Sequence, residues 1–106
     1  MKNIIAKLNK TFDSRIRLGI MSLLMVHERI EFTLLKELLS LSDGNLASHL
    51  KGLEAELYVE FNKQFVGRKP QTTYWATELG KKAFTEHLDA LEALWHFGKQ
   101  DDAPKS

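Results

Sequence analysis

Histidine, serine and acidic side chains are the groups in this chain that could carry out catalysis, so their spacing comes first. The four histidines are scattered and no cysteine accompanies them, so no set has the spacing of a metal site. Ser48 and His49 are neighbours on a predicted helix, where their side chains point about 100° apart and cannot act as nucleophile and base. The segment VGRKP has a single glycine and is no phosphate-cradling loop. The pattern predicts no enzyme, no metal site and no cofactor.

A second kind of chemistry is hydrogen bonding by the segment SDGNLASHLKGL, residues 42–53. At 100° per residue, Leu46, Leu50 and Leu53 fall on one side of a helix. The opposite side carries small or polar side chains and is nearly flat. Because a glycine in a helix interior costs about 1 kcal/mol relative to alanine, that flat face indicates a close approach to something. Spacing alone does not decide between docking into a DNA groove and packing against another helix.

For DNA docking, the side chains of this helix can be matched to the chemistry of the bases. Amides pair with adenine and hydroxyls with several bases, which makes Asn45 and Ser48 the predicted base-edge readers. Lys51 is predicted to reach a guanine or a phosphate. Ser42 is the predicted N-cap, which would aim first-turn N–H groups at a phosphate. The predicted DNA-binding positions of this helix (about residues 43–57) are Ser42, Gly44, Asn45, Ser48, His49, Lys51 and Gly52.

Two of these positions have a particular expectation. His49 lies on the flank of the leucine stripe and is expected to be partly buried or to face a phosphate rather than to read a base. Gly52 lies in the helix interior and is expected on the outward face, where the absence of a side chain lets the backbone come close to DNA.

A β-hairpin is predicted after the helix. In YVEFNKQF, Val59, Phe61 and Phe65 alternate with polar residues, which predicts a strand with one buried face. VGRKPQ is a turn, and TTYWAT is the returning strand. At the tip, Arg68 and Lys69 are predicted to contact phosphates or the minor groove. Lys63 is a weaker candidate for the same role, and a merely soluble turn tip is the alternative.

Composition agrees with one globular domain. The chain has 106 residues, of which 43% are hydrophobic and 27% charged, and its net charge is +1. Residues 1–20 and 61–82 each hold five basic side chains and one acidic one, so each segment carries +4 (5 minus 1). Such asymmetry suggests an anionic partner. No apolar run of about 18 residues occurs, and a cytoplasmic protein without a membrane partner is expected.

The elements that must position these side chains follow from the hydrophobic pattern. A single domain is expected over residues 1–98. It begins with an amphipathic helix over 1–11, followed by a central helix, a short strand at RIEF, a helix and the flat-faced helix. After the hairpin, Thr77 caps a long helix over 78–97, and 99–106 form a polar tail. The predicted class is mainly α (α+β).

Three segments together resemble a known family. RLGIM (17–21) lies in the central helix, LSDGNLASHLKGLE (41–54) includes the flat-faced helix, and FVGRKPQTTYWATELGKKAF (65–84) spans the hairpin and the next helix. They are similar to the small stand-alone winged helix-turn-helix DNA-binding regulators of bacteria and archaea, related to the MarR and ArsR families. The resemblance covers most of residues 12–84. It departs at Leu57, where the family usually has a glycine, and at Ala76, where it usually has a leucine.

The resemblance implies a fold and a role. The expected fold is a winged helix-turn-helix with a two-stranded β-wing and a long C-terminal helix. The expected function is sequence-specific transcription regulation on double-stranded DNA, with the recognition helix in the major groove and the wing (about 65–71) on phosphate or in the minor groove. The resemblance favours DNA docking of the flat face over helix packing. The alternative is a winged-helix protein–protein interaction module without DNA binding.

A homodimer is also expected, because the last helix has a longer apolar stripe than one domain needs to bury. In the dimer, the second subunit would cover this stripe. The alternative is that the stripe covers the core of the monomer. The predicted dimer residues are Ile4, Ile5, Leu8, Leu88, Leu91, Leu94 and Trp95. The sequence does not reveal a small-molecule effector.

Overall fold

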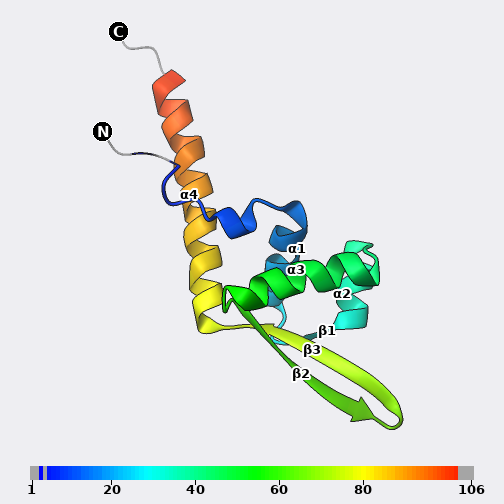
Figure 1. Cartoon of the computed structure of the whole chain (residues 1–106). Coiled ribbons are helices and arrows are strands. Elements are labelled where there is room, and N and C mark those ends of the chain that lie inside the picture. Colours follow the sequence, from blue (N-terminus) through cyan, green and yellow to red (C-terminus); the bar gives the residue numbers. More distant parts are fainter. Residues whose placement is uncertain (1–2, 4, 103–106) are drawn as a thin grey trace.

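The computed structural model describes residues 3 and 5–102 of the chain. Figure 1 shows a small helical core from which one long helix and one β-hairpin extend. In chain order the elements are a 3-10 helix η1 (Lys10–Phe12), α1 (Arg15–Val26), β1 (Ile30–Glu31), α2 (Phe32–Leu39), α3 (Asp43–Ala55), β2 (Val59–Val66), β3 (Lys69–Ala76) and α4 (Glu78–Asp102). This order confirms the predicted winged helix-turn-helix.

The core is built where α1, α2 and α3 turn their apolar faces towards one another. Leu46, Leu50 and Leu53 of α3 are all fully buried, as their helical spacing predicted. They join α1 through Ile20, which is also fully buried, and α2 through Leu35. The leucine stripe therefore fixes which face of α3 looks outward.

The predicted hairpin is present, and its sheet has one strand more. β2 and β3 pair antiparallel from Val59 opposite Ala76 to Val66 opposite Lys69. The short β1 pairs with β3, so the strand order is β1-β3-β2. Gly67 has φ 67° in the two-residue connection, as the first central residue of a tight hairpin turn often requires.

The prediction that one face of β2 is buried is wrong beyond the first residue of the strand. Val59 is buried, but Phe61 is 41% and Phe65 is 74% exposed. Alternation correctly placed these side chains on one face of a strand. Because the hairpin leaves the core, nothing in the described structure covers that face near the tip (Figure 1).

The helix expected over residues 1–11 is not formed by the described residues. A turn occupies residues 5–7, and η1 follows it. Asn9 caps η1, since its side chain accepts a hydrogen bond from the N–H of Thr11 at 2.9 Å. Phe12 at the end of η1 is buried and contacts Phe84 edge-on at 5.3 Å between ring centroids. In place of the predicted amphipathic helix, the described segment has a short 3-10 helix that Asn9 caps and that the buried Phe12 ring anchors to the core.

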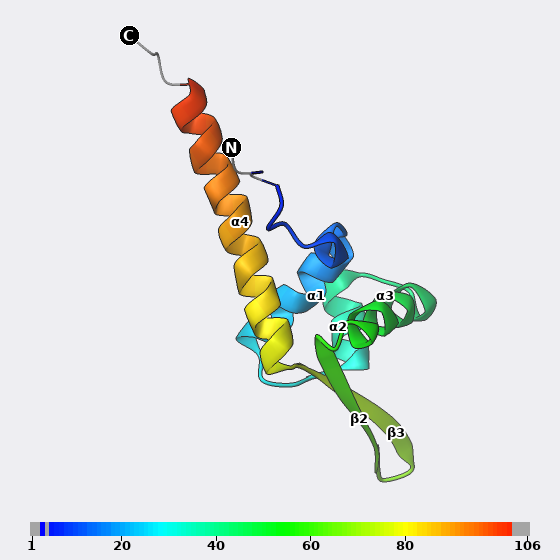
Figure 2. The same cartoon turned by 60° about the vertical axis from the view of Figure 1, so that its left-hand side comes forward.

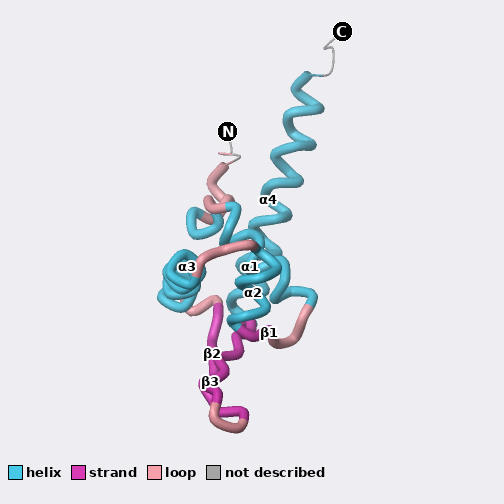
Figure 3. The backbone as a smooth tube through the Cα atoms, turned by 90° about the vertical axis from the view of Figure 1, so that its right-hand side faces the viewer, coloured by secondary structure: helices cyan, strands magenta, loops and turns pink. Residues whose placement is uncertain are grey.

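α4 is the longest element and continues beyond the predicted limit at residue 97. Residues 99–102 of the predicted tail extend the helix to Asp102, and 103–106 lie outside the described residues. Figures 2 and 3 show α4 rising past the core on the side opposite to the wing, with the N-terminal segment beside it. Among the described residues, no helix has both the length and the apolar composition needed to cross a membrane.

Candidate nucleic-acid interface

The helix-turn-helix is formed by α2, a short turn and α3. Ser42 is the N-cap of α3, as predicted, and its hydroxyl accepts a hydrogen bond from the N–H of Asn45 at 3.2 Å. The ammonium of Lys36 in α2 lies 2.9 Å from the carboxylate of Asp43. An acidic residue in the first turn suits the positive end of the helix dipole. The cap therefore closes the first turn of α3, and the ion pair links that turn to α2.

The outward face of α3 carries most of the predicted DNA-binding positions. Gly44, Asn45, Ser48 and Lys51 are all exposed. They lie opposite the buried leucines, and a Cβ added at Gly44 would meet no other atom within 4 Å. This part of the helix is accessible along its length and bears one amide, one hydroxyl and one ammonium group. Those are groups that hydrogen-bond to base edges.

The flank of α3 carries a cation from another helix. The guanidinium of Arg17 in α1 lies against Gly52, where an added Cβ would collide with it. Its Nε donates a hydrogen bond to Nδ1 of His49 at 3.1 Å. Gly52 is half-buried, which corrects the expectation that it lies on the open outward face. His49 is half-buried, as expected.

The C-terminus of α3 is closed by the residue at which the chain departs from the family pattern. Leu57 has φ 65°, the left-handed conformation that a glycine normally adopts there. Its N–H bonds to the carbonyl of Glu54 at 2.9 Å, and the N–H of Tyr58 bonds to that of Leu53 at 3.0 Å. These are the two bonds of a Schellman motif. The helix therefore ends in the usual geometry although a leucine stands in place of glycine.

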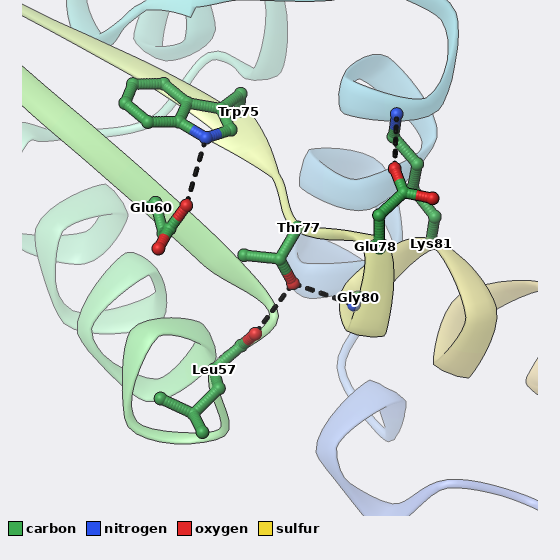
Figure 4. Close-up of polar contacts among 7 residues, drawn as sticks. All are labelled: Leu57, Glu60, Trp75, Thr77, Glu78, Gly80 and Lys81. Carbon is green, nitrogen blue, oxygen red and sulfur yellow. Dashed lines mark hydrogen bonds and ion pairs between the residues drawn. The ribbon is translucent and has the colours of Figure 1, made fainter.

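α3 and α4 are joined through the residue that caps α4. The hydroxyl of Thr77 accepts a hydrogen bond from the N–H of Gly80 at 2.9 Å, which confirms the predicted cap. The backbone N–H of Thr77 also donates to the carbonyl of Tyr58 at 3.0 Å. Figure 4 shows Thr77 between Gly80 and the chain that leaves α3. A Cβ at Gly80 would collide with the Tyr58 carbonyl, so this joint needs glycine.

The wing places its predicted cationic residues in solvent. Lys63, Arg68 and Lys69 are all exposed, and none forms an ion pair among the described residues. The base of the wing is fixed instead by Trp75, whose indole N–H donates to the carboxylate of Glu60 at 3.2 Å. Exposed cations at the tip of a hairpin suit contact with a polyanion.

The predicted dimer residues gather on α4 and the segment before η1. Leu88, Leu91 and Trp95 are exposed, whereas Leu94 is half-buried. Ile5 is exposed and Leu8 half-buried; Ile4 lies outside the described residues. A groove of about 430 Å³ separates this segment from α4 and is lined by Asn3, Ala6, Lys7, Ala90, Ala93, Leu94 and Phe97.

Within the part of the chain that the structure describes, no group of three or more histidine, aspartate and glutamate side chains is placed to hold a metal ion.

Comparison with known families agrees with this geometry. A family model described as a winged helix DNA-binding domain matches residues 16–95, which is more than half of the chain. The chain therefore belongs to the winged helix DNA-binding domain family. An uncharacterized protein of Methanocaldococcus jannaschii is 40% identical over 79 residues, which are 74% of this chain and 86% of that protein.

Solved structures show the same fold. A transcriptional regulator homologue from Pyrococcus horikoshii OT3 matches with a TM-score of 0.72 and 29% identity, over 85% of this chain and 94% of that one. A MarR family transcriptional regulator from Silicibacter pomeroyi matches with a TM-score of 0.65 over 95% of this chain and 67% of that one. Its identity is 15%, so this second likeness concerns the fold alone.

Proposed function

We propose that this protein is a sequence-specific DNA-binding transcriptional regulator that acts as a homodimer in the cytoplasm and has no enzymatic activity. The observation that carries the proposal is the outward face of α3, where Asn45, Ser48 and Lys51 are exposed opposite fully buried leucines. A B-DNA major groove about 12 Å wide admits one helix. In the proposed complex α3 lies in that groove, with Asn45 and Ser48 on base edges.

The wing is proposed to add contacts outside the major groove. Arg68 and Lys69 stand at the end of a hairpin that extends from the core beside α3 (Figure 1). Exposed cations at this position would lie on phosphates or in the minor groove, and Lys63 would assist from the same hairpin. Such contacts add affinity on any sequence and position α3 for reading bases.

The proposed dimer uses α4. Trp95 is 63% and Leu91 39% exposed on a helix that extends beyond the core, and contiguous apolar surface of this kind usually marks an interaction site. A second copy of α4 would cover it about a two-fold axis. Two recognition helices would then reach half-sites one DNA turn, about 34 Å, apart.

Selection of binding sites from random duplex DNA tests the proposal with the purified full chain at about 0.1 M salt. We expect enrichment of a pseudo-palindrome whose half-sites are about ten base pairs apart. Replacing Asn45 or Ser48 by alanine should then relax preference at one position of each half-site. Absence of enrichment, with binding that disappears as salt rises, would reject sequence-specific regulation and favour a protein–protein interaction module.

A further inference from the structure

Arg17 occupies a position in α1 that does not favour a positive charge. Its backbone N–H donates to the hydroxyl of Ser14, the N-cap, at 3.3 Å, so Arg17 lies in the first turn. Arg15 lies there too, and that turn holds no acidic residue. Cations are unfavourable at this positive end of a helix dipole. The stability of α1 therefore gives no reason for a cation at this position.

Nor does an ion pair explain the charge. Among the described residues, the basic side chains paired with carboxylates are Lys36 and Lys81. Arg17 is half-buried and has no such partner. A half-buried guanidinium without a carboxylate retains donors that are suited to an oxyanion.

The guanidinium is held in one place by α3. One of its five N–H donors binds Nδ1 of His49, and its Cζ and both terminal nitrogens lie close to where a Cβ of residue 52 would stand. An Nδ1 that accepts a hydrogen bond belongs to a neutral ring with its proton on Nε2. Burial, and then the charge of Arg17, lowers the pKa of His49, which keeps the ring neutral and able to accept.

This fixed guanidinium lies beside the outward face of α3. At 100° per residue, positions 52 and 49 lie between Ser48 of the outward face and Leu53 of the buried face. A helix with side chains is about 10–12 Å wide, close to the width of the major groove. When its outward face looks at the base edges, its flanks lie beside the sugar–phosphate walls.

We propose that Arg17 binds a DNA backbone phosphate on the wall of the groove that α3 enters. His49 and Gly52 are positioning residues for it, the first as hydrogen-bond acceptor and the second by leaving room. This proposal rests on the proposed function and adds to it a contact from α1. The remaining guanidinium donors make a charge-assisted hydrogen bond with the phosphate.

The test is the salt dependence of DNA affinity for Arg17→Gln and Gly52→Ala. The first removes the charge, and the second keeps the charge but displaces the guanidinium. Loss of one phosphate contact lowers the slope of log affinity against log salt by about 0.9. The deficit of Arg17→Gln should therefore shrink about 3.5-fold between about 50 and 200 mM salt, equally on specific and random duplexes. Gly52→Ala should change in the same direction.

Lys82→Gln is the matched control, because it removes one positive charge from an exposed residue on the side of α4 away from the proposed dimer contact. It should bind as wild type does. The double variant Arg17→Gln, Gly52→Ala should lose no more DNA affinity than Arg17→Gln alone, because both changes remove the same phosphate contact. If Arg17→Gln does not fold, Gly52→Ala carries the test.

The outcomes separate the two proposals. A wild-type protein that binds no DNA overturns the proposed function. A wild-type protein that binds DNA while Arg17→Gln keeps the wild-type salt slope overturns only the phosphate contact. In that case Arg17 would serve to pack α1 against α3.

Discussion

The hydroxyl of Thr77 donates a hydrogen bond to the carbonyl oxygen of Leu57 at 2.7 Å (Figure 4). Leu57 follows α3 and Thr77 precedes α4, so one side chain links the two helices across the base of the wing. The same hydroxyl caps α4 through the N–H of Gly80. In the proposed dimer, α4 would pack against its copy at the two-fold axis and α3 would contact the DNA bases. The Thr77–Leu57 bond would then help to set the distance between the two reading helices.

Replacing Thr77 by valine should destabilise the protein by about 1–2 kcal/mol, because an isosteric side chain loses both the cap and the bond to Leu57. Thr77→Ser keeps the hydroxyl and is the matched control, so its loss should be less than half as large. Urea denaturation of the two variants measures the difference. Equal losses would mean that packing of the methyl group, rather than the hydroxyl, holds the joint.

Leu57→Gly should raise the free energy of unfolding by about 0.5–1 kcal/mol. A non-glycine residue in the left-handed region costs about 1–2 kcal/mol, and glycine removes this cost. Glycine also increases the conformational entropy of the unfolded chain, which offsets part of the gain in stability. Little burial is lost, since Leu57 is 67% exposed. Leu57→Ala removes the same apolar group but keeps Cβ, and should leave stability nearly unchanged. A stabilisation by alanine equal to that by glycine would show that the exposed side chain, and not the backbone, is unfavourable.

Local patterns were sufficient to predict the elements that shape the candidate interface. The spacing of Leu46, Leu50 and Leu53 identified α3 and its buried side, because helix periodicity and burial coincide there. Ser42 and Thr77 were recognised as caps because an N-cap acts within three residues of its partner. The same patterns were insufficient for Phe61 and Phe65, since alternation defines two faces of a strand but not whether anything covers them.

Contacts between distant parts of the chain could not be predicted from the sequence. Arg17 and His49 are 32 residues apart, and their contact depends on how α1 packs against α3. Gly52 gave a signal, since its cost in a helix indicated a close approach. The approaching group was expected to be DNA or another helix and is in part a guanidinium from α1. The N-terminal prediction failed because the apolar spacing of Ile5 and Leu8 is outweighed by the Asn9 cap and the Phe12 anchor.

Arg68→Ala with Lys69→Ala should weaken DNA binding on all sequences alike. If both side chains contact phosphates, the slope of log affinity against log salt should fall by about 2, nearly one per contact. Lys81→Ala with Lys82→Ala removes the same charge at the start of α4 and is the control. Titrations at several salt concentrations measure the slopes. A wing variant with the wild-type slope would show that the wing does not contact phosphates.

Leu91→Asp should convert the proposed dimer into a folded monomer, because a carboxylate would be buried at the α4–α4 contact. Leu91 is partly exposed within the chain, so the variant should still fold. Leu38→Asp makes the same chemical change on an exposed leucine of α2 and should leave the dimer intact. Sedimentation at micromolar concentration distinguishes the states. A monomeric wild type would contradict the dimer directly.

The stability of the protein should depend on pH through His87. This side chain is only 3% exposed, and its Nδ1 accepts a hydrogen bond from the backbone N–H of Asn9 at 2.9 Å. Burial lowers the pKa of His87 below its usual 6.5, and the nearby charge of Asp13 opposes this in part. The folded protein therefore binds fewer protons than the unfolded chain as the pH falls below about 6.5. Stability should be greatest above that pH and should decrease below it.

Denaturation of the wild type and of His87→Asn between about pH 7.5 and 5.5 checks this dependence. In this range histidine side chains, rather than carboxylates, change their protonation. The asparagine amide oxygen can accept the same N–H without titrating, so its stability should change less with pH than that of wild type. Some dependence should remain, because the pKa of His49 is also lowered by burial and by Arg17. His96→Asn, on the exposed side of the same helix, should retain the wild-type profile. If His87→Asn also retains it, the bond between His87 and the N-terminal segment does not depend on pH in this range.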